Sequence, residues 1–402
     1  MPYRVDQATT MINFACRYYK GSRPCIYNKL DGSECPTCSH GSKYGERILF
    51  IKLDAVGDVF RSQSLLPAII ARHKMPYIAW LTGKEAVPLV RIMRDVDEVI
   101  VLSEEGVART LAGDWHQVYS LSNDLQSASL ATLASRRGTP VGFYMRDGLI
   151  APSNDAAMRW LEMGAFDRLK ANNTLSFQRR MLDILGEPPD APILPPAIEL
   201  DIGLRQRAEA RLEKLFGSGR PRVAVNLGSS ARWPKKMLYP EQICRYARLL
   251  RQRIDVDVVL LGGNAEADKA AAIMAMRQPE DRIEVALTGD SVLDFLGLLS
   301  QVDALLCGDT LALHIATGLK LPTVAVFGPT TITEIHTYDG LIAKTRVESL
   351  PCLVCQGDCE KEQNCMSLMD LNELVELTVR QLRWGAGKSR DRATLFGGSN
   401  EV

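Results

Sequence analysis

The strongest constraint on the fold is a repeated alternation of short apolar runs with helix-length segments. In the first half of the chain the runs have the composition of β-strands and lie at 47–53, 76–81, 98–102, 116–121 and 140–145. Strands that alternate with helices favour a parallel, doubly wound sheet. Pro67 falls within the first helical pattern, and we expect it to kink or shorten that helix.

A second unit of the same kind follows a proline-rich segment. The sequence GEPPDAPILPPAIELD, residues 186–201, is unsuited to a helix interior or a central strand and indicates an extended connector. Strand-like runs then resume at 222–227, 257–263, 283–286, 304–309 and 322–328. The prediction is an α/β protein with Rossmann-like domains at 47–190 and 221–385, joined by a linker and connecting helix at 191–220. A cysteine-rich extension, 1–46, precedes them, a flexible tail, 386–402, follows, and a last helix begins near Asp370 with a capping box to Glu373.

Composition limits the partners. The 402 residues suit two domains, and Lys+Arg and Asp+Glu both number 48, so no overall positive field favours nucleic acid. No apolar stretch reaches the roughly 18 residues that span a membrane, and we expect a soluble cytoplasmic protein, with peripheral contact at the inner membrane as an alternative. The sequence does not determine the oligomeric state, and an oligomer is possible. The 10 cysteines are expected to stay reduced, so metal binding is the leading explanation where they cluster.

Ligands of open α/β sheets bind at the carboxyl ends of the strands, so the strand-to-helix loops are the candidate sites. The loop 54–58 places Asp58 at a helix start, either facing a cleft or merely capping the helix. The segment after 222–227 supplies Ser229, Ser230 and two lysines, Lys235 and Lys236, which are suitable donors for a diphosphate unless the loop is simply solvated.

Two further loops complete the candidate site. Glu266 follows a strand that ends in two glycines and is expected either to accept hydrogen bonds from a ribose or to cap a helix. After the strand 304–309, Asp309 and Thr310 lie at a helix start that can bind an anion. His314 comes one turn later and is either part of the site or a structural histidine.

These motifs together resemble glycosyltransferase family 9, the heptosyltransferases. IKLDAVGDVFRSQSLLPAI resembles the family's N-terminal signature, and ALLCGDTLALHIATGLKLPTVAVFGPT resembles its Asp-Ser/Thr-Gly-x-x-His-x-Ala segment followed by Phe-Gly-Pro-Thr. The resemblance implies a GT-B fold, with Asp58 as the general base and Lys236, Ser229, Ser230 and Thr310 at the leaving diphosphate. Lys235 competes with Lys236 for that role. Leu311 stands where the family has glycine, which is expected to alter the donor pocket.

The same resemblance implies the reaction. It is an inverting transfer of heptose, or a related sugar, from an ADP-heptose-like donor to the lipopolysaccharide core. We interpret neither half as carrying an Asp-x-Asp metal motif, and we expect no catalytic metal. A soluble saccharide or a protein hydroxyl, as in autotransporter-modifying enzymes, is an alternative acceptor. A non-catalytic nucleotide-sugar binder, a metal-stapled assembly protein and an epimerase of the same fold are alternative functions.

Two cysteine clusters flank the domains. Cys16, Cys25, Cys35 and Cys38 precede the first strand, and Cys352, Cys355, Cys359 and Cys365 precede the last helix. Four thiolates suit zinc, iron or an iron–sulfur cluster, and the alternative is free thiols. The second cluster resembles a segment of family 9 in which related enzymes hold iron, which implies a structural metal. The first lies among Arg17, Lys20 and Arg23 and would suit an acidic or lipid surface or be an ordinary solvated face.

Overall fold

The computed structural model describes residues 11–21, 23–228, 236–355 and 359–387. Its first half contains a six-stranded sheet in the order β3-β2-β1-β4-β5-β6. Neighbouring strands are parallel except for the pair β5–β6. The strands are β1 Arg47–Ile51, β2 Tyr77–Thr82, β3 Glu98–Val101, β4 Gln117–Ser120, β5 Val141–Arg146 and β6 Leu149–Pro152.

The second half contains a separate six-stranded sheet, which is entirely parallel, in the order β12-β11-β10-β7-β8-β9. Its central strands are buried on both faces because helices cover each side, as parallel sheets require. The strands are β7 Arg222–Asn226, β8 Asp257–Gly262, β9 Ile283–Leu287, β10 Ala304–Gly308, β11 Thr323–Phe327 and β12 Ile342–Arg346.

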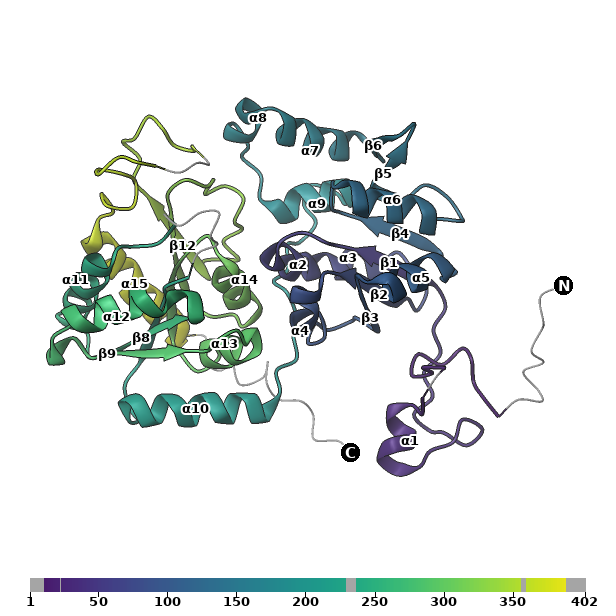
Figure 1. Cartoon of the computed structure of the whole chain (residues 1–402), viewed down its shortest axis with the longest axis horizontal. Helices are drawn as coiled ribbons and strands as arrows, with labels where there is room; N and C mark the ends of the chain where they lie inside the picture. Colours follow the sequence, from purple (N-terminus) through teal and green to yellow (C-terminus); the bar gives the residue numbers. More distant parts are fainter. Residues whose placement is uncertain (1–10, 22, 229–235, 356–358, 388–402) are drawn as a thin grey trace.

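Helices flank both sheets (Figure 1). Those of the first half, together with α1 of the N-terminal extension, are α1 Ile26–Asp31, α2 Val56–Arg61, α3 Leu66–Ile70, α4 Val87–Val90, α5 Glu104–Ala112, α6 Leu125–Ala134, α7 Asp155–Ala165, α8 Asp167–Ala171 and α9 Phe177–Leu185. Those of the second half are α10 Ile202–Phe216, α11 Pro240–Arg251, α12 Ala267–Met276, α13 Val292–Leu299, α14 Leu311–Gly318 and α15 Leu371–Gly387. Short 3₁₀ turns are η1 Ser62–Leu65, η2 Lys84–Ala86, η4 Asn264–Glu266 and η5 Pro279–Asp281.

The helix interruption and the extended connector that the sequence predicts are both present. Pro67 stands in the first turn of α3, after a 3₁₀ turn that separates α3 from α2, so the helical pattern is interrupted there. Residues 186–201 contain no helix or strand and make only a single bridge, between Met93 and Ile198.

The last helix differs in detail from the expectation. The Asp370 carboxylate does accept from the backbone N–H of Asn372, at 2.8 Å, as a helix-start residue should. Glu373 does not return the bond as a capping box requires, because its carboxylate accepts from the Thr345 hydroxyl on β12 instead. The helix also runs to Gly387 and so enters the segment 386–402 that was expected to be a loose tail.

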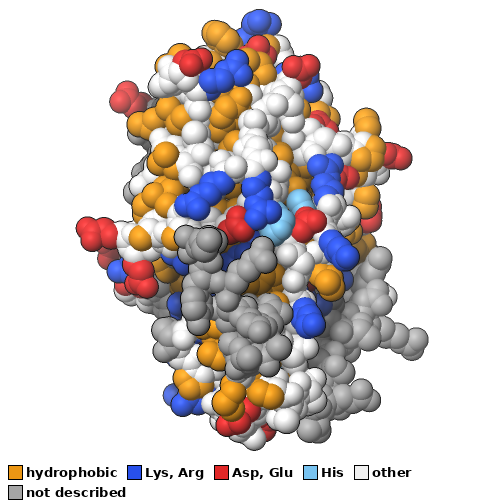
Figure 2. Space-filling view, turned by 90° about the vertical axis from the view of Figure 1, so that its right-hand side faces the viewer, with side chains coloured by type: hydrophobic (Ala, Val, Ile, Leu, Met, Phe, Trp, Pro, Cys, Tyr) orange, Lys and Arg blue, Asp and Glu red, His pale blue; other side chains and the backbone are white. Residues whose placement is uncertain are grey.

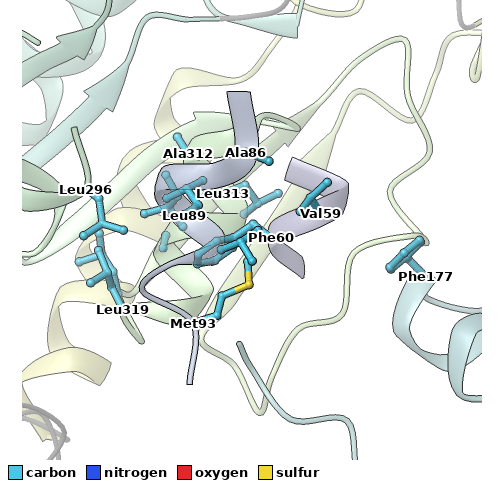
Figure 3. Close-up of a cluster of buried hydrophobic side chains, with 14 of the residues drawn as sticks. Val59, Phe60, Ala86, Leu89, Met93, Phe177, Leu296, Ala312, Leu313 and Leu319 are labelled. Atoms are coloured by element: carbon cyan, nitrogen blue, oxygen red, sulfur yellow. The ribbon is translucent and has the colours of Figure 1, made fainter. Parts of the chain in front are cut away.

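A single apolar core joins the two halves. Figure 3 shows Phe60 of α2 beside Leu89 and Met93, facing Leu313 and Leu319 of the second half. Phe60 packs so closely on α14 that a side-chain carbon at Gly318 would lie 2.9 Å from its ring. Helix α9 also reaches the second half, since the Gln178 amide donates to the Tyr338 hydroxyl at 2.8 Å. These contacts fix how the two sheets face each other.

The N-terminal extension is fastened to the first domain by its basic residues. Arg17 is ion-paired with Asp97 at 2.5 Å, and the Lys20 ammonium donates to the Asp97 carbonyl at 3.4 Å. Arg17 is therefore engaged within the protein, whereas Lys20 stays exposed. On the face drawn in Figure 2, basic and acidic side chains are interspersed. Within the part of the chain that the structure describes, no helix combines the length and apolarity needed to cross a membrane.

Candidate active site

A cleft of about 820 Å³ lies between the two halves, at the carboxyl ends of their parallel strands. Loops and helix starts from both sheets line it. Among the residues singled out from the sequence, the lining includes Asp58, Lys236, Glu266, Asp309, Thr310, Leu311 and His314. Ser229, Ser230 and Lys235 lie outside the described residues. The fold thus brings side chains that are far apart in the sequence to one cavity, which we expected from their positions in four strand-to-helix loops.

Asp58 projects into the cleft from the first turn of α2. The preceding N-cap residue, Ala55, has no side chain able to cap, and the Asp58 carboxylate instead forms an ion pair with Arg61 at 2.5 Å. Arg61 is held in place because its guanidinium lies 3.7 Å from the centre of the Phe177 ring. Lys52, buried at the end of β1, donates to the Leu121 carbonyl and pairs with Asp54 at 2.7 Å.

The charges around Asp58 determine its protonation. Burial alone would raise the pKa of the Asp58 carboxyl, but the positive charges of Arg61 and Lys52 hold the pKa below its usual value. Asp58 is therefore ionised at neutral pH, as a group that accepts a proton must be. The same charges lower its basicity.

His314 reaches the wall of the cleft that α2 forms, although it belongs to the second half. It lies on α14, and its ring packs so closely on α2 that a side-chain carbon at Gly57 would approach its Cδ2 atom to 2.7 Å. Burial and the charge of Arg61 lower the pKa of His314 to about 4. The imidazole is therefore neutral at physiological pH and contributes packing and hydrogen-bonding capacity rather than charge.

The opposite wall is built from β7, β10 and the start of α14. The Lys236 ammonium is 3.4 Å from the Asp309 carboxylate and also donates to the Asp309 carbonyl. Thr310 is the N-cap residue of α14, and its hydroxyl accepts from the amide of Asn226 at 3.2 Å. An ammonium, a hydroxyl and the free N–H groups of a helix start form a suitable environment for a diphosphate. Leu311 lines the same wall.

Glu266 is both part of the lining and a cap. Its Oε2 atom accepts from the backbone N–H of Gly263 at 2.7 Å, which matches the capping alternative. Its side chain also faces the opposite loop, since a carbon added at Gly228 would lie 3.3 Å from Oε1. The carboxylate that makes this capping bond also lines the cleft. That Glu266 accepts hydrogen bonds from a ribose therefore stays a prediction.

Several lining residues were not identified from the sequence. Asn226 ends β7 and could have been found by the strand-end rule that identified the others. Arg61, Lys170 and Glu334 carry no such signal, because they lie at a helix end, in α8 and in a loop. Burial raises the pKa of the half-buried Glu334 carboxyl, and Phe177 of α9 donates its N–H to the Glu334 carbonyl at 2.9 Å.

Each cysteine cluster gathers around a hollow of its own. Cys352, Cys355, Cys359 and Cys365 line a cavity of about 30 Å³ beside Pro329, and burial together with the neighbouring thiols raises the pKa of Cys365. A separate cavity of about 350 Å³ has Cys16, Cys25, Cys35 and Cys38 in its lining.

The thiols suit zinc or iron chemically, but their positions do not converge. Within residues 11–21, 23–228, 236–355 and 359–387, no three His, Cys, Asp or Glu side chains are grouped so as to hold a metal ion. The structural metal therefore stays a prediction for both clusters. Two Asp-x-Asp sequences do occur elsewhere, at 95–97 and 255–257, but Asp97 and Asp257 are paired with Arg17 and Arg220 away from the cleft.

Comparison with known proteins places this architecture. The E. coli ADP-heptose lipopolysaccharide heptosyltransferase II has a similar structure, with a TM-score of 0.62 at 21% identity over 85% of this chain and 99% of that one. The E. coli heptosyltransferase WaaC with ADP gives a TM-score of 0.51 at 16% identity, over 84% of this chain and 99% of that one. The two facing sheets thus have the GT-B fold of these structures.

The sequence narrows the class to a family. The model of glycosyltransferase family 9 (heptosyltransferase) matches residues 170–366. Lipopolysaccharide heptosyltransferase 2 of Escherichia coli K12 is 27% identical over 307 residues, which are 70% of this chain and 83% of that protein. The chain belongs to glycosyltransferase family 9 and is an enzyme of that family.

Proposed function

We propose that the chain is an inverting heptosyltransferase that uses an ADP-heptose-like donor and a saccharide acceptor, with the lipopolysaccharide core as the leading acceptor. The donor is supported by the family and by the relatives, whose names include ADP-heptose and lipopolysaccharide. The observation that carries the proposal is the position of Asp58 on one wall of a single cleft and of Lys236 and Thr310 on the other.

The proposed reaction is one displacement at the anomeric carbon. Asp58 takes the proton of the acceptor hydroxyl, whose oxygen forms the new bond to that carbon while the bond to the diphosphate breaks. ADP departs with the bonding electrons. Lys236 and the N–H groups at the start of α14 lie where they would stabilise the negative charge that develops on the diphosphate.

Asp309 has a separate role in this proposal. Its carboxylate holds the Lys236 ammonium and so positions that cation before the donor arrives. Because a second negative charge beside a diphosphate would be unfavourable, we expect Lys236 to exchange Asp309 for phosphate oxygens when the donor binds.

The test combines donor binding with product analysis. Purified protein is titrated with ADP-heptose, UDP-glucose and GDP-mannose, and is then incubated with ADP-heptose plus a lipopolysaccharide core oligosaccharide or a serine-rich peptide. The proposal expects ADP-heptose to bind most tightly and the core oligosaccharide to gain the mass of one heptose. Heptosylation of the peptide alone would identify a protein acceptor instead. Isomerisation of the donor without acceptor would indicate an epimerase, and failure of ADP-heptose to bind would refute the proposal.

A further inference from the structure

Arg61 is a cation in a place where most proteins bury an apolar side chain. It is the last residue of α2, its side chain is only 9% exposed, and it is adjacent to the fully buried Phe60. The guanidinium stacks on Phe177 and forms one ion pair, with Asp58. A charge buried at such a position is costly unless it is paired and hydrogen-bonded.

The pairing is incomplete. A guanidinium presents five N–H donors, and the Nε donor of Arg61 is buried and has no hydrogen-bond partner among the described residues. The side chain nevertheless belongs to the lining of the cleft, together with Lys170 and Glu334. The unsatisfied group is therefore adjacent to the space that a substrate would occupy.

The ion pair also conflicts with the role of Asp58. A carboxylate held by a guanidinium at 2.5 Å is stabilised in its ionised form, so it accepts a proton less readily. The other groups that face Asp58 do not relieve this. Lys52 adds a second positive charge, and the buried His314 is neutral. Burial raises the pKa of the Glu334 carboxyl, and among the described residues no ion pair joins Glu334 to Arg61.

We propose that Arg61, together with Lys170 of the same cleft lining, binds an acid group of the acceptor, a carboxylate or a phosphate ester close to the hydroxyl that reacts. The inference rests on the proposed function and specifies the class of acceptor. The acid group forms N–H···O bonds with the guanidinium while the bond between Arg61 and Asp58 breaks. No proton moves in this exchange, and Asp58 then accepts the hydroxyl proton.

Arg61 is thus a specificity residue. A neutral acceptor would leave Asp58 in its ion pair and would also leave the Nε donor unsatisfied. An anionic acceptor would release Asp58 from its ion pair and would give the Nε donor a hydrogen-bond partner. The planar guanidinium matches the paired oxygens of a carboxylate or phosphate.

The first test uses simple probes on the full-length protein. With ADP at saturation, so that the diphosphate wall is occupied, methyl phosphate and acetate are titrated calorimetrically into wild type, Arg61→Met and Arg61→Lys. We expect wild type to bind at least one probe and Arg61→Met to bind it about tenfold more weakly or not at all. The preferred probe identifies phosphate or carboxylate as the acid group. Arg61→Lys, which keeps the charge but not the planar fork, should fall between them.

Arg179→Met is the matched control. Arg179 is also buried, with 10% of its side chain exposed, and pairs with Asp183 at 2.8 Å on α9, but it does not line the cleft. This control should bind the probes as wild type does. Equal binding by wild type and Arg61→Met, or no binding by either, would overturn the inference. If ADP itself fails to bind, the proposed function fails, and the same titration without ADP still tests Arg61.

A kinetic readout separates recognition from mere stability. Core oligosaccharide is compared with the same material after dephosphorylation or after esterification of its carboxylates. Wild type should prefer the native acceptor by about 10- to 100-fold in kcat/KM, and Arg61→Met should lose most of that preference. Because loss of the Arg61 charge raises the pKa of Asp58, the acidic limb of the kcat/KM profile should also move to higher pH in Arg61→Met. An unchanged preference and an unmoved limb would contradict the inference.

Discussion

Burial leaves His314 without a charge in a site that contains several charged side chains. Its ring is only 8% exposed and packs on α2 beside the Asp58–Arg61 pair, and its pKa lies near 4 in the folded protein. The ordinary pKa of histidine, 6.5, applies once the chain unfolds. Between these two values the unfolded chain binds a proton that the folded chain does not, so acidification favours unfolding.

This difference predicts how stability depends on pH. From pH 7 to pH 4 the free energy of unfolding of wild type should fall by up to about 3 kcal/mol relative to that of His314→Gln, which carries no titratable ring. Above pH 7 the two stabilities should run parallel. Urea unfolding of both proteins across this range measures the difference between their free energies of unfolding. A difference that stays constant down to pH 4 would show that His314 binds a proton as readily in the folded protein as in the unfolded chain.

How far the site could be predicted depends on where each residue lies. Asp58, Glu266 and Asp309 follow strand ends, and that topological rule brings them to one edge of their sheets without any knowledge of packing. Arg61 and Glu334 enter the cleft because helix α9 packs against both halves, a tertiary fact that no local pattern encodes.

At the level of elements, the start of α2 depends on a residue without a side chain. At Gly57 an added carbon would meet His314 at 2.7 Å, closer than real contacts allow. Gly164 in α7 is a matched helical glycine, because an added carbon there would meet nothing nearer than 3.9 Å.

Alanine at these two glycines should therefore have opposite effects. We expect Gly57→Ala to destabilise the protein by about 1–3 kcal/mol through overpacking. Gly164→Ala should stabilise it by about 0.4–1 kcal/mol, because alanine restricts the unfolded chain and suits a helix. Thermal unfolding of the two variants beside wild type checks both signs. Equal stability of Gly57→Ala and wild type would show that α2 and α14 are not in close contact in solution.

The positions of the central strands were easier to predict than the edge strands and the side-chain contacts between elements. The central strands alternate with helices and end in Gly or Asp turns, so the expected runs agree with β1–β5 and β7–β11 to within a residue or two at each end. Strands β6 and β12 were missed because Leu149–Pro152 ends in proline and Ile342–Arg346, at a sheet edge, has only two apolar residues before three polar ones. The sequence pattern predicted that the Glu373 side chain caps its own helix. The bond that it makes instead, to Thr345, could not be predicted because it depends on the position of the neighbouring strand β12.

For the whole molecule, the central claim is that one cleft combines a base from the first half with diphosphate-binding groups from the second. The continuous core around Phe60 and Leu313 holds the two halves together, so Asp58 and Lys236 line one cavity although they lie 178 positions apart in the sequence. The length suggested two domains, whereas the packing of one half on the other, above all of α2 on α14, determines which loops meet.

The most direct test of this claim is the kinetics of Asp58→Asn with ADP-heptose and a productive acceptor. We expect kcat to fall by about 10² to 10⁴, with the dissociation constant of ADP-heptose changed by less than about twofold, because the base and the donor groups occupy different walls. Asp54→Asn, in the same loop but paired with Lys52 outside the lining, should lose less than about tenfold in kcat. Full activity in Asp58→Asn, or an equal loss of donor affinity, would contradict the account.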